Sequence, residues 1–183
     1  FIMIYKKIHK YYLHIKYFFK HKTFILLKIC YFFRSPRLTA YIWVKFADIL
    51  IPSDSKSNRS ILVFTNGGGD LDLLARPKNH INKEQYLSIS KVTTDDMLKS
   101  FFGSKRFDYN YETLKKRKKI KFNKFLKFIE ALVTYLNEKH NIIGFINFNH
   151  VYSCHREIIS TAQTKKIPFV VVFKECFRND NLW

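Results

Sequence analysis

Two apolar runs separated by one helical segment constrain the fold of this chain more than any other feature of its sequence. The run 142–148 is short and apolar, as in a strand, and the run 169–173 is fully apolar, which is typical of a strand buried on both faces of a parallel sheet. Between them, 152–166 carries apolar residues at helical spacing, with Ser153 as a candidate N-cap. Strand, helix and strand with short connections predict a βαβ unit, whose right-handed crossover makes the two strands parallel. We therefore expect an α/β fold with a doubly wound parallel sheet.

Earlier segments extend the same alternation. The run 61–65 is short and apolar and predicts another buried strand. Residues 86–92 are a candidate strand, 93–96 supply helix-capping side chains, and 97–102 are expected to form a short helix. Residues 122–140 repeat apolar side chains at intervals of about 3.6 positions, which predicts an amphipathic helix.

The first third of the chain carries much of its charge. The formal net charge is +19, and residues 1–59 hold 12 basic and 2 acidic side chains. Such a field attracts polyanions, although the abundance of Lys, Asn, Ile, Phe and Tyr also fits an AT-rich coding bias. An apolar stripe with 4-3-4-3 spacing predicts a basic amphipathic helix; its members are Ile4, Ile8, Tyr11, Ile15 and Phe18. This helix can lie on an anionic membrane surface or pack on the protein's own core, and both alternatives stay open.

Polar residues 52–59 predict a linker. We therefore expect a basic helical arm over 1–51 and an α/β domain over 60–183. No apolar run in the arm is long enough, and free enough of charge, to span a bilayer. Three cysteines at irregular spacing, without a Cys-x-x-Cys pair, argue against a disulfide framework and a zinc site, and favour a reducing compartment. We expect no metal and no cofactor.

Ligands of open parallel sheets bind at the carboxyl ends of the strands, which nominates three loops. The candidate substrate-binding residues in these loops are Gly67, Gly68, Gly69, Asp70, Asn149, Tyr152, Arg156, Lys174 and Glu175. The glycines either let backbone amides approach a phosphate or a sugar, or form a flexible turn. The Lys174–Glu175 pair lies in the cleft or pairs internally. Candidate general bases are His150, His155 and Glu157, since histidine titrates near neutrality; Glu157 can instead serve the helix dipole.

The segment 143–178 also resembles a known family. Gly144 to Asn149, Tyr152 with His155-Arg156-Glu157, Lys166 to Val172, and Lys174-Glu175-Cys176 are similar to the amino-terminal Rossmann-like domain of bacterial capsule and surface-polysaccharide biosynthesis proteins, which are GT-B-type glycosyltransferase-like. The resemblance is close over about a fifth of the chain and extends to the rest only in layout.

The resemblance implies two facing Rossmann-like domains, with a glycan or lipid-linked acceptor bound mostly by the first and a nucleotide-sugar donor mostly by the second. This chain would be the first domain, truncated at its C-terminus and inactive without the missing C-terminal domain. It would work in the cytoplasm, peripherally at the inner face of the cytoplasmic membrane. An inverting transferase needs a base for the acceptor hydroxyl, and the sequence does not decide among His150, His155 and Glu157.

Two other functions remain open. A basic nucleic-acid-binding protein is indicated by the net charge, the run 115–119 and the interleaved Tyr and Phe, although no nucleic-acid-binding motif is present. A non-catalytic membrane-associated scaffold is favoured if residues 150–175 form no cleft and their charges pair with one another. These alternatives differ in the expected dependence on salt, since phosphate-driven binding falls steeply with ionic strength.

Overall fold

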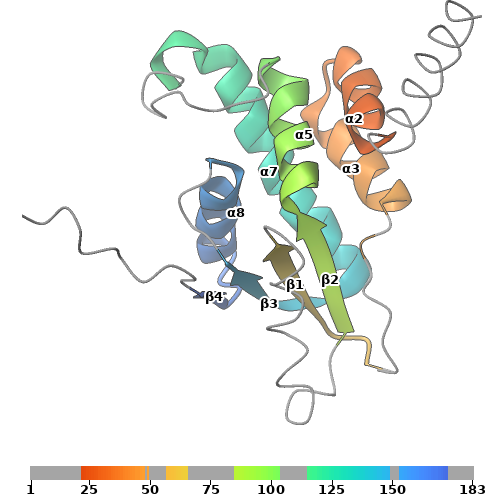
Figure 1. Ribbon diagram of the computed structural model, residues 1–183, viewed down its shortest axis with the longest axis vertical. Helices are drawn as coiled ribbons and strands as arrows, with labels where there is room; N and C mark the ends of the chain where they lie inside the picture. Colours follow the sequence, from red (N-terminus) through yellow and green to blue (C-terminus); the bar gives the residue numbers. More distant parts are fainter. Residues whose placement is uncertain are drawn as a thin grey trace, which may run out of the picture.

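The described residues form a four-stranded, all-parallel sheet, from which a layer of helices extends to one side (Figure 1). The computed structural model describes residues 22–47, 49, 57–65, 85–103, 115–148 and 153–172. The strands are β1 (Ser60–Thr65), β2 (Gln85–Ser90), β3 (Ile142–Asn147) and β4 (Phe169–Val171), in the order β2-β1-β3-β4. The predicted α/β class and the parallel pairing of the last two strands are confirmed. The arrangement is compatible with a Rossmann-like fold.

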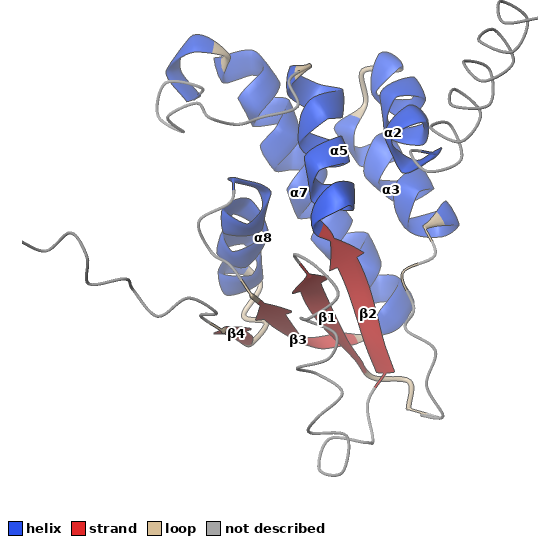
Figure 2. Ribbon diagram, viewed as in Figure 1, coloured by secondary structure: helices blue, strands red, loops and turns tan. Residues whose placement is uncertain are grey.

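The helices among the described residues cover the sheet and extend beyond it (Figure 2). They are α2 (Lys22–Phe32), α3 (Pro36–Phe46), α5 (Lys91–Phe102), α7 (Lys119–His140) and α8 (Ser153–Thr164). The connections from β2 to β3 and from β3 to β4 step across the sheet in the same direction. Right-handed crossovers therefore place α7 and α8 on the same face. The β1–β2 connection steps the other way and lies outside the described residues.

The predicted helix over 122–140 is confirmed and begins three residues earlier, at Lys119. Its buried side chains form one face and join the main core; they are Phe122, Phe125, Phe128, Ile129, Ala131, Leu132, Val133 and Leu136. The helix ends at Asn141, which adopts a left-handed conformation with φ of 48°. The amide of Ile142 then donates to the Asn137 side chain at 2.9 Å, so two asparagines make the tight turn into β3.

The boundary between β2 and α5 differs from the sequence prediction. The helix begins at Lys91, six residues before the expected Met97, and its N-cap is Ser90 rather than a residue of 93–96. The Ser90 hydroxyl accepts a hydrogen bond from the amide of Thr93 at 3.3 Å. Serine in the last strand position caps the helix without an intervening loop. Figure 1 shows α5 continuing from the tip of β2, away from the sheet.

The strand predicted to be buried on both faces is exposed. β4 spans only Phe169–Val171, pairs with β3 on one side, and leaves the side chain of Val170 58% exposed. The apolar composition of 169–173 was misleading because it does not distinguish an edge strand from a central one.

Helices α2 and α3 pack against α5 and α7 rather than on the sheet. Trp43 and Leu27 are almost completely buried and belong to the same hydrophobic core as the sheet residues Leu62 and Phe64. The Nζ of Lys139 also donates to the carbonyl of Val44 at 2.7 Å. These two helices, which fall within the predicted arm, thus share the core of the α/β domain. The expected amphipathic helix over 4–20 lies outside the described residues.

None of the helices in the described parts of the chain combines the length and the apolar character that crossing a bilayer requires.

Candidate functional site

The strand order places a topological switch point between β1 and β3. From β1 the chain moves to β2 on one side, and from β3 it moves to β4 on the other. Ligands of open parallel sheets bind outside the carboxyl ends of the strands at such a point. The N-termini of α5 and α8 follow these ends, which adds partial positive charge there. Buried polar side chains at the carboxyl ends of the strands and in the first two turns of these helices are Thr65, Thr94, Asp96, Asn147, His155 and Glu157.

His155 packs onto the sheet. Its side chain is fully buried, and its ring lies with its centroid 5.2 Å from that of Phe64 in β1, at an interplanar angle of 46°. Phe64 in turn stacks on Phe145 of β3, with centroids 6.2 Å apart. Asn147, opposite Phe64 in the strand register, is buried as well. The imidazole therefore belongs to the helix–sheet interface at the switch point and not to a solvent-filled space.

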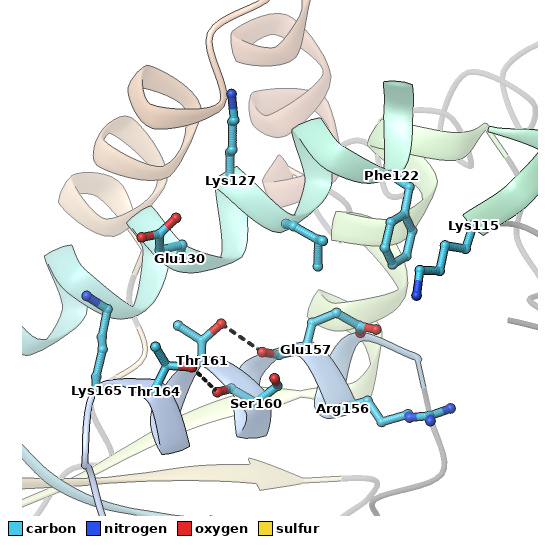
Figure 3. Close-up of a pocket in the computed structure, with 11 residues that line it drawn as sticks. Lys115, Phe122, Lys127, Glu130, Arg156, Glu157, Ser160, Thr161, Thr164 and Lys165 are labelled. Atoms are coloured by element: carbon cyan, nitrogen blue, oxygen red, sulfur yellow. Dashed lines mark hydrogen bonds between the residues drawn. The ribbon is translucent and has the colours of Figure 1, made fainter. Parts of the chain in front are cut away.

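Glu157 lines a different space. A groove of about 510 Å³ runs between α7 and α8 (Figure 3). Its lining residues are Lys115, Phe122, Leu126, Lys127, Glu130, Arg156, Glu157, Ser160, Thr161, Thr164 and Lys165. Figure 3 shows the Glu157 side chain extending towards Lys115. Since successive residues of an α-helix are rotated by about 100°, His155 and Glu157 point in nearly opposite directions from α8. The structure therefore does not bring these two candidate bases to one site.

The groove has an excess of positive charge. Four of its lining residues are Lys or Arg, and two are Glu. On the α8 wall the hydroxyl of Thr161 donates to the Glu157 carbonyl at 2.8 Å, and the hydroxyl of Thr164 donates to the Ser160 carbonyl at 3.0 Å. Cations, carboxylates and hydroxyls around a partly apolar floor suit a hydroxylated or anionic ligand.

The sequence pattern pointed to Arg156 and Glu157 in this wall but not to the residues of the opposite wall. Lys127 and Glu130 lie three residues apart on the polar face of α7. In the sequence, this spacing of charged residues is typical of an ordinary solvent-exposed helix surface. Only the packing of α7 on α8 turns that surface into one side of a groove. No signal in the sequence marked it, because the contact joins segments far apart along the chain.

Cys154, at the start of α8, is buried and is a free thiol. Its pKa is raised well above the usual range, first by desolvation and then by the negative charges of Glu157 and Asp95. A thiol in this environment stays protonated and is a poor nucleophile. The electrostatic influence of Asp95 also shows that the first turns of α5 and α8 approach each other, in agreement with their packing contact.

Most residues nominated from the three loops lie outside the described residues; these are Gly67, Gly68, Gly69, Asp70, Asn149, His150, Tyr152, Lys174 and Glu175. Their roles stay predictions. Across 22–47, 49, 57–65, 85–103, 115–148 and 153–172, no three His, Cys, Asp or Glu side chains gather closely enough to hold a metal ion.

Comparison of the chain with protein-family models, with curated proteins and with solved structures found no match. The function is therefore argued from the residues and their geometry.

Proposed function

We propose that this chain is the acceptor-side, amino-terminal domain of a glycosyltransferase-like protein of bacterial surface-polysaccharide biosynthesis. The observation that carries the proposal is the charged groove between α7 and α8, since α8 is the helix that follows β3 at the switch point of an all-parallel sheet. The same stretch of α8 holds the His-Arg-Glu sequence on which the family resemblance rests. A glycan or lipid-linked acceptor is the ligand class that a groove of hydroxyls, carboxylates and cations suits.

Glu157 is the base that this geometry favours. Of the two described candidates, Glu157 is buried in the wall of the groove, whereas His155 is enclosed between α8 and the sheet. In an inverting transfer, the carboxylate would accept the proton of the acceptor hydroxyl as that oxygen attacks the sugar and the nucleotide leaves. Lys115 and Arg156 would hold the acceptor through its anionic or hydroxyl groups. The nucleotide-sugar donor would be bound mostly by a second, C-terminal domain, so the chain alone would not transfer sugar.

Saturation-transfer NMR tests acceptor binding directly. The full chain is mixed with methyl glycosides of common hexoses and hexosamines, and transfer to the sugar protons is measured. We expect transfer with at least one glycoside, a marked loss in Arg156→Ala, and no change in Lys121→Ala, an exposed cation of α7 outside the groove. Absence of transfer to every glycoside, or equal loss in both variants, would contradict an acceptor site in this groove.

The proposal includes a cytoplasmic, peripheral location at the inner face of the cytoplasmic membrane. Its support is the cationic N-terminal third, which anionic lipid attracts. Flotation of the full chain with vesicles containing phosphatidylglycerol tests it. A chain that stays at the bottom of the gradient at low salt would contradict this location.

A nucleic-acid-binding function is the alternative that a specific observation favours. Every side chain of 115–119 is exposed, and these five residues form a compact cationic row before and at the start of α7. If the row binds phosphates, the affinity for a single-stranded oligonucleotide should be measurable and should fall steeply with salt. Lys116→Ala with Arg117→Ala should then lower both the affinity and the salt slope. A non-catalytic scaffold would show neither glycan nor oligonucleotide binding.

A further inference from the structure

Helix α2 is apolar on most of its sides, and Lys28 is its one charged residue beyond the first turn. Eight of its eleven residues are apolar or aromatic, and they are not confined to the side that packs on α5. Leu27 and Cys30 are buried, whereas Ile29 is exposed and Phe32 is 81% exposed. A helix that is hydrophobic on most of its sides is normally covered there by protein or by lipid. The outward side of α2 has no such enclosure among the described residues.

The exposed apolar side continues through the turn into α3. Phe33 is 65% exposed and meets Phe32 edge to face, with centroids 6.2 Å apart. Ile29 precedes Phe32 by three residues, so these two side chains share one side of the helix, and Phe33 follows directly in the turn. Leu38, in the first turns of α3, is exposed as well. We call this set, Ile29, Phe32, Phe33 and Leu38, the hairpin tip. Contiguous apolar surface of this kind marks an interaction site.

Hydrogen bonds of the turn and a ring contact beneath it hold the hairpin tip in place. The amide of Arg34, which has a left-handed φ of 59°, donates to the carbonyl of Tyr31 at 2.8 Å. Ser35 caps α3 by accepting from the amide of Leu38 at 3.3 Å, and Pro36 follows in the first turn. Beneath the tip the Tyr31 ring packs on Phe101 of α5, with centroids 4.5 Å apart. Figure 1 shows the α2–α3 turn at the end of the helical layer far from the sheet. The exposed rings are therefore presented by an ordered turn.

Cations surround the hairpin tip. Lys28, Arg34 and Arg37 are exposed beside it, and the segment 22–47 contains no Asp or Glu. Apolar rings framed by cations match the interface of an anionic bilayer, where the rings enter the acyl boundary and the cations meet the head groups. We propose that the α2–α3 hairpin docks on an anionic lipid surface through Ile29, Phe32, Phe33 and Leu38, with Arg34 and Arg37 on the head groups. The inference rests on the proposed peripheral membrane location and assigns it to a defined surface.

The chemistry of the hairpin tip and of the cations around it favours an anionic lipid surface over a second copy of the chain and over nucleic acid. A second copy of this chain would bring its own Lys28, Arg34 and Arg37 against the same three cations, and like charges across an interface repel each other. Single-stranded nucleic acid would use the aromatic faces for stacking but leaves aliphatic Ile29 and Leu38 in water. Hydrocarbon accepts all four apolar side chains.

Vesicle flotation of the full chain tests the proposal. The vesicles contain phosphatidylcholine alone, or three parts phosphatidylcholine to one part phosphatidylglycerol. For the double variant Phe32→Ser with Phe33→Ser, we expect affinity for the anionic vesicles to fall by about tenfold or more, because two apolar side chains no longer enter the interface. Arg34→Ala with Arg37→Ala should abolish the preference for phosphatidylglycerol. Circular dichroism confirms that each variant is folded.

The matched control is Ile120→Ser, which removes a 75% exposed apolar side chain from α7 beside other lysines. It should bind as the wild type does. Wild-type binding with no loss in the double Phe variant, or an equal loss in Ile120→Ser, would overturn the hairpin assignment while leaving the membrane location intact. Absence of wild-type binding would overturn both the assignment and the membrane location.

A wild type that elutes as a dimer, and a Phe variant that elutes as a monomer, would instead identify a second copy as the occupant. Displacement from vesicles by an oligonucleotide in the wild type but not in the Phe variant would overturn lipid as the ligand.

Discussion

The ring of Phe64 in β1 and the imidazole of His155 in α8 lie with their centroids 5.2 Å apart, although 91 positions separate them in the sequence. This contact joins β1, one of the two inner strands of the sheet, to the helix that carries the candidate site. It also places one of the candidate bases in the core, so the stability of the fold and the position of α8 depend on the same side chain.

His155→Ala should therefore lower the free energy of unfolding by about 2–4 kcal/mol, because it leaves a cavity between α8 and the sheet. Urea denaturation followed by circular dichroism measures the change. His140→Ala, at the end of α7 where the histidine is only half-buried, should cost less than about 1 kcal/mol. Equal effects of the two variants would show that His155 is not packed as described.

Trp43→Ala should destabilise the whole protein by about 3–5 kcal/mol, since this buried indole of α3 packs within the same core as the sheet. Unfolding should remain a single transition when it is followed by circular dichroism. If α3 belonged to an independent arm, the variant would leave the main transition in place and remove only part of the helical signal.

Gly103→Ala should cost about 1 kcal/mol. Gly103 ends α5 with φ of 78°, a left-handed conformation that alanine adopts only with strain, although the space around it is open. Gly144→Ala is the matched control, because its backbone is not left-handed and an added Cβ would meet the Pro168 carbonyl at an ordinary 3.6 Å. Thermal unfolding should separate the two variants, and a larger cost at Gly144 would contradict this account.

The Cys154 thiol should make the protein less stable at alkaline pH. Its pKa is raised in the folded state by burial and by the charges of Glu157 and Asp95, so above the ordinary thiol pKa the folded state holds a proton that the unfolded state has lost. The contribution of this thiol to the free energy of unfolding is fully present below the ordinary thiol pKa. It is lost as the pH rises from there towards the higher pKa of the folded state. Urea denaturation of wild type and Cys154→Ala at neutral and alkaline pH should show a smaller loss in the variant, and an identical loss would disprove the effect.

His140 should have the opposite pH dependence, on the acidic side. Its pKa is lowered by desolvation first and by Lys139 second, so the unfolded state binds a proton more readily than the folded state. Stability should therefore decrease as pH falls through the ordinary histidine pKa towards the lower folded-state pKa. His140→Gln should lose less stability over this interval in urea titrations. A greater loss in the variant would contradict the direction of the shift.

Local patterns in the sequence determined the alternation of strands and helices, the amphipathic helix that became α7 and the parallel pairing of β3 with β4. Each depends on spacing within a short segment or on the handedness of one crossover. Even here Ser90 shows a limit, because its capping role depends on where β2 stops pairing with β1.

Tertiary packing decided the rest. It enclosed His155 against Phe64, turned Glu157 towards a groove whose other wall comes from α7, and left Val170 at an exposed edge. It also drew α2 and α3 into the core while leaving Phe32 outside. Whether a side chain is buried depends on which distant segment of the chain packs against it. Composition alone does not distinguish an apolar residue that the protein covers from one that it leaves exposed.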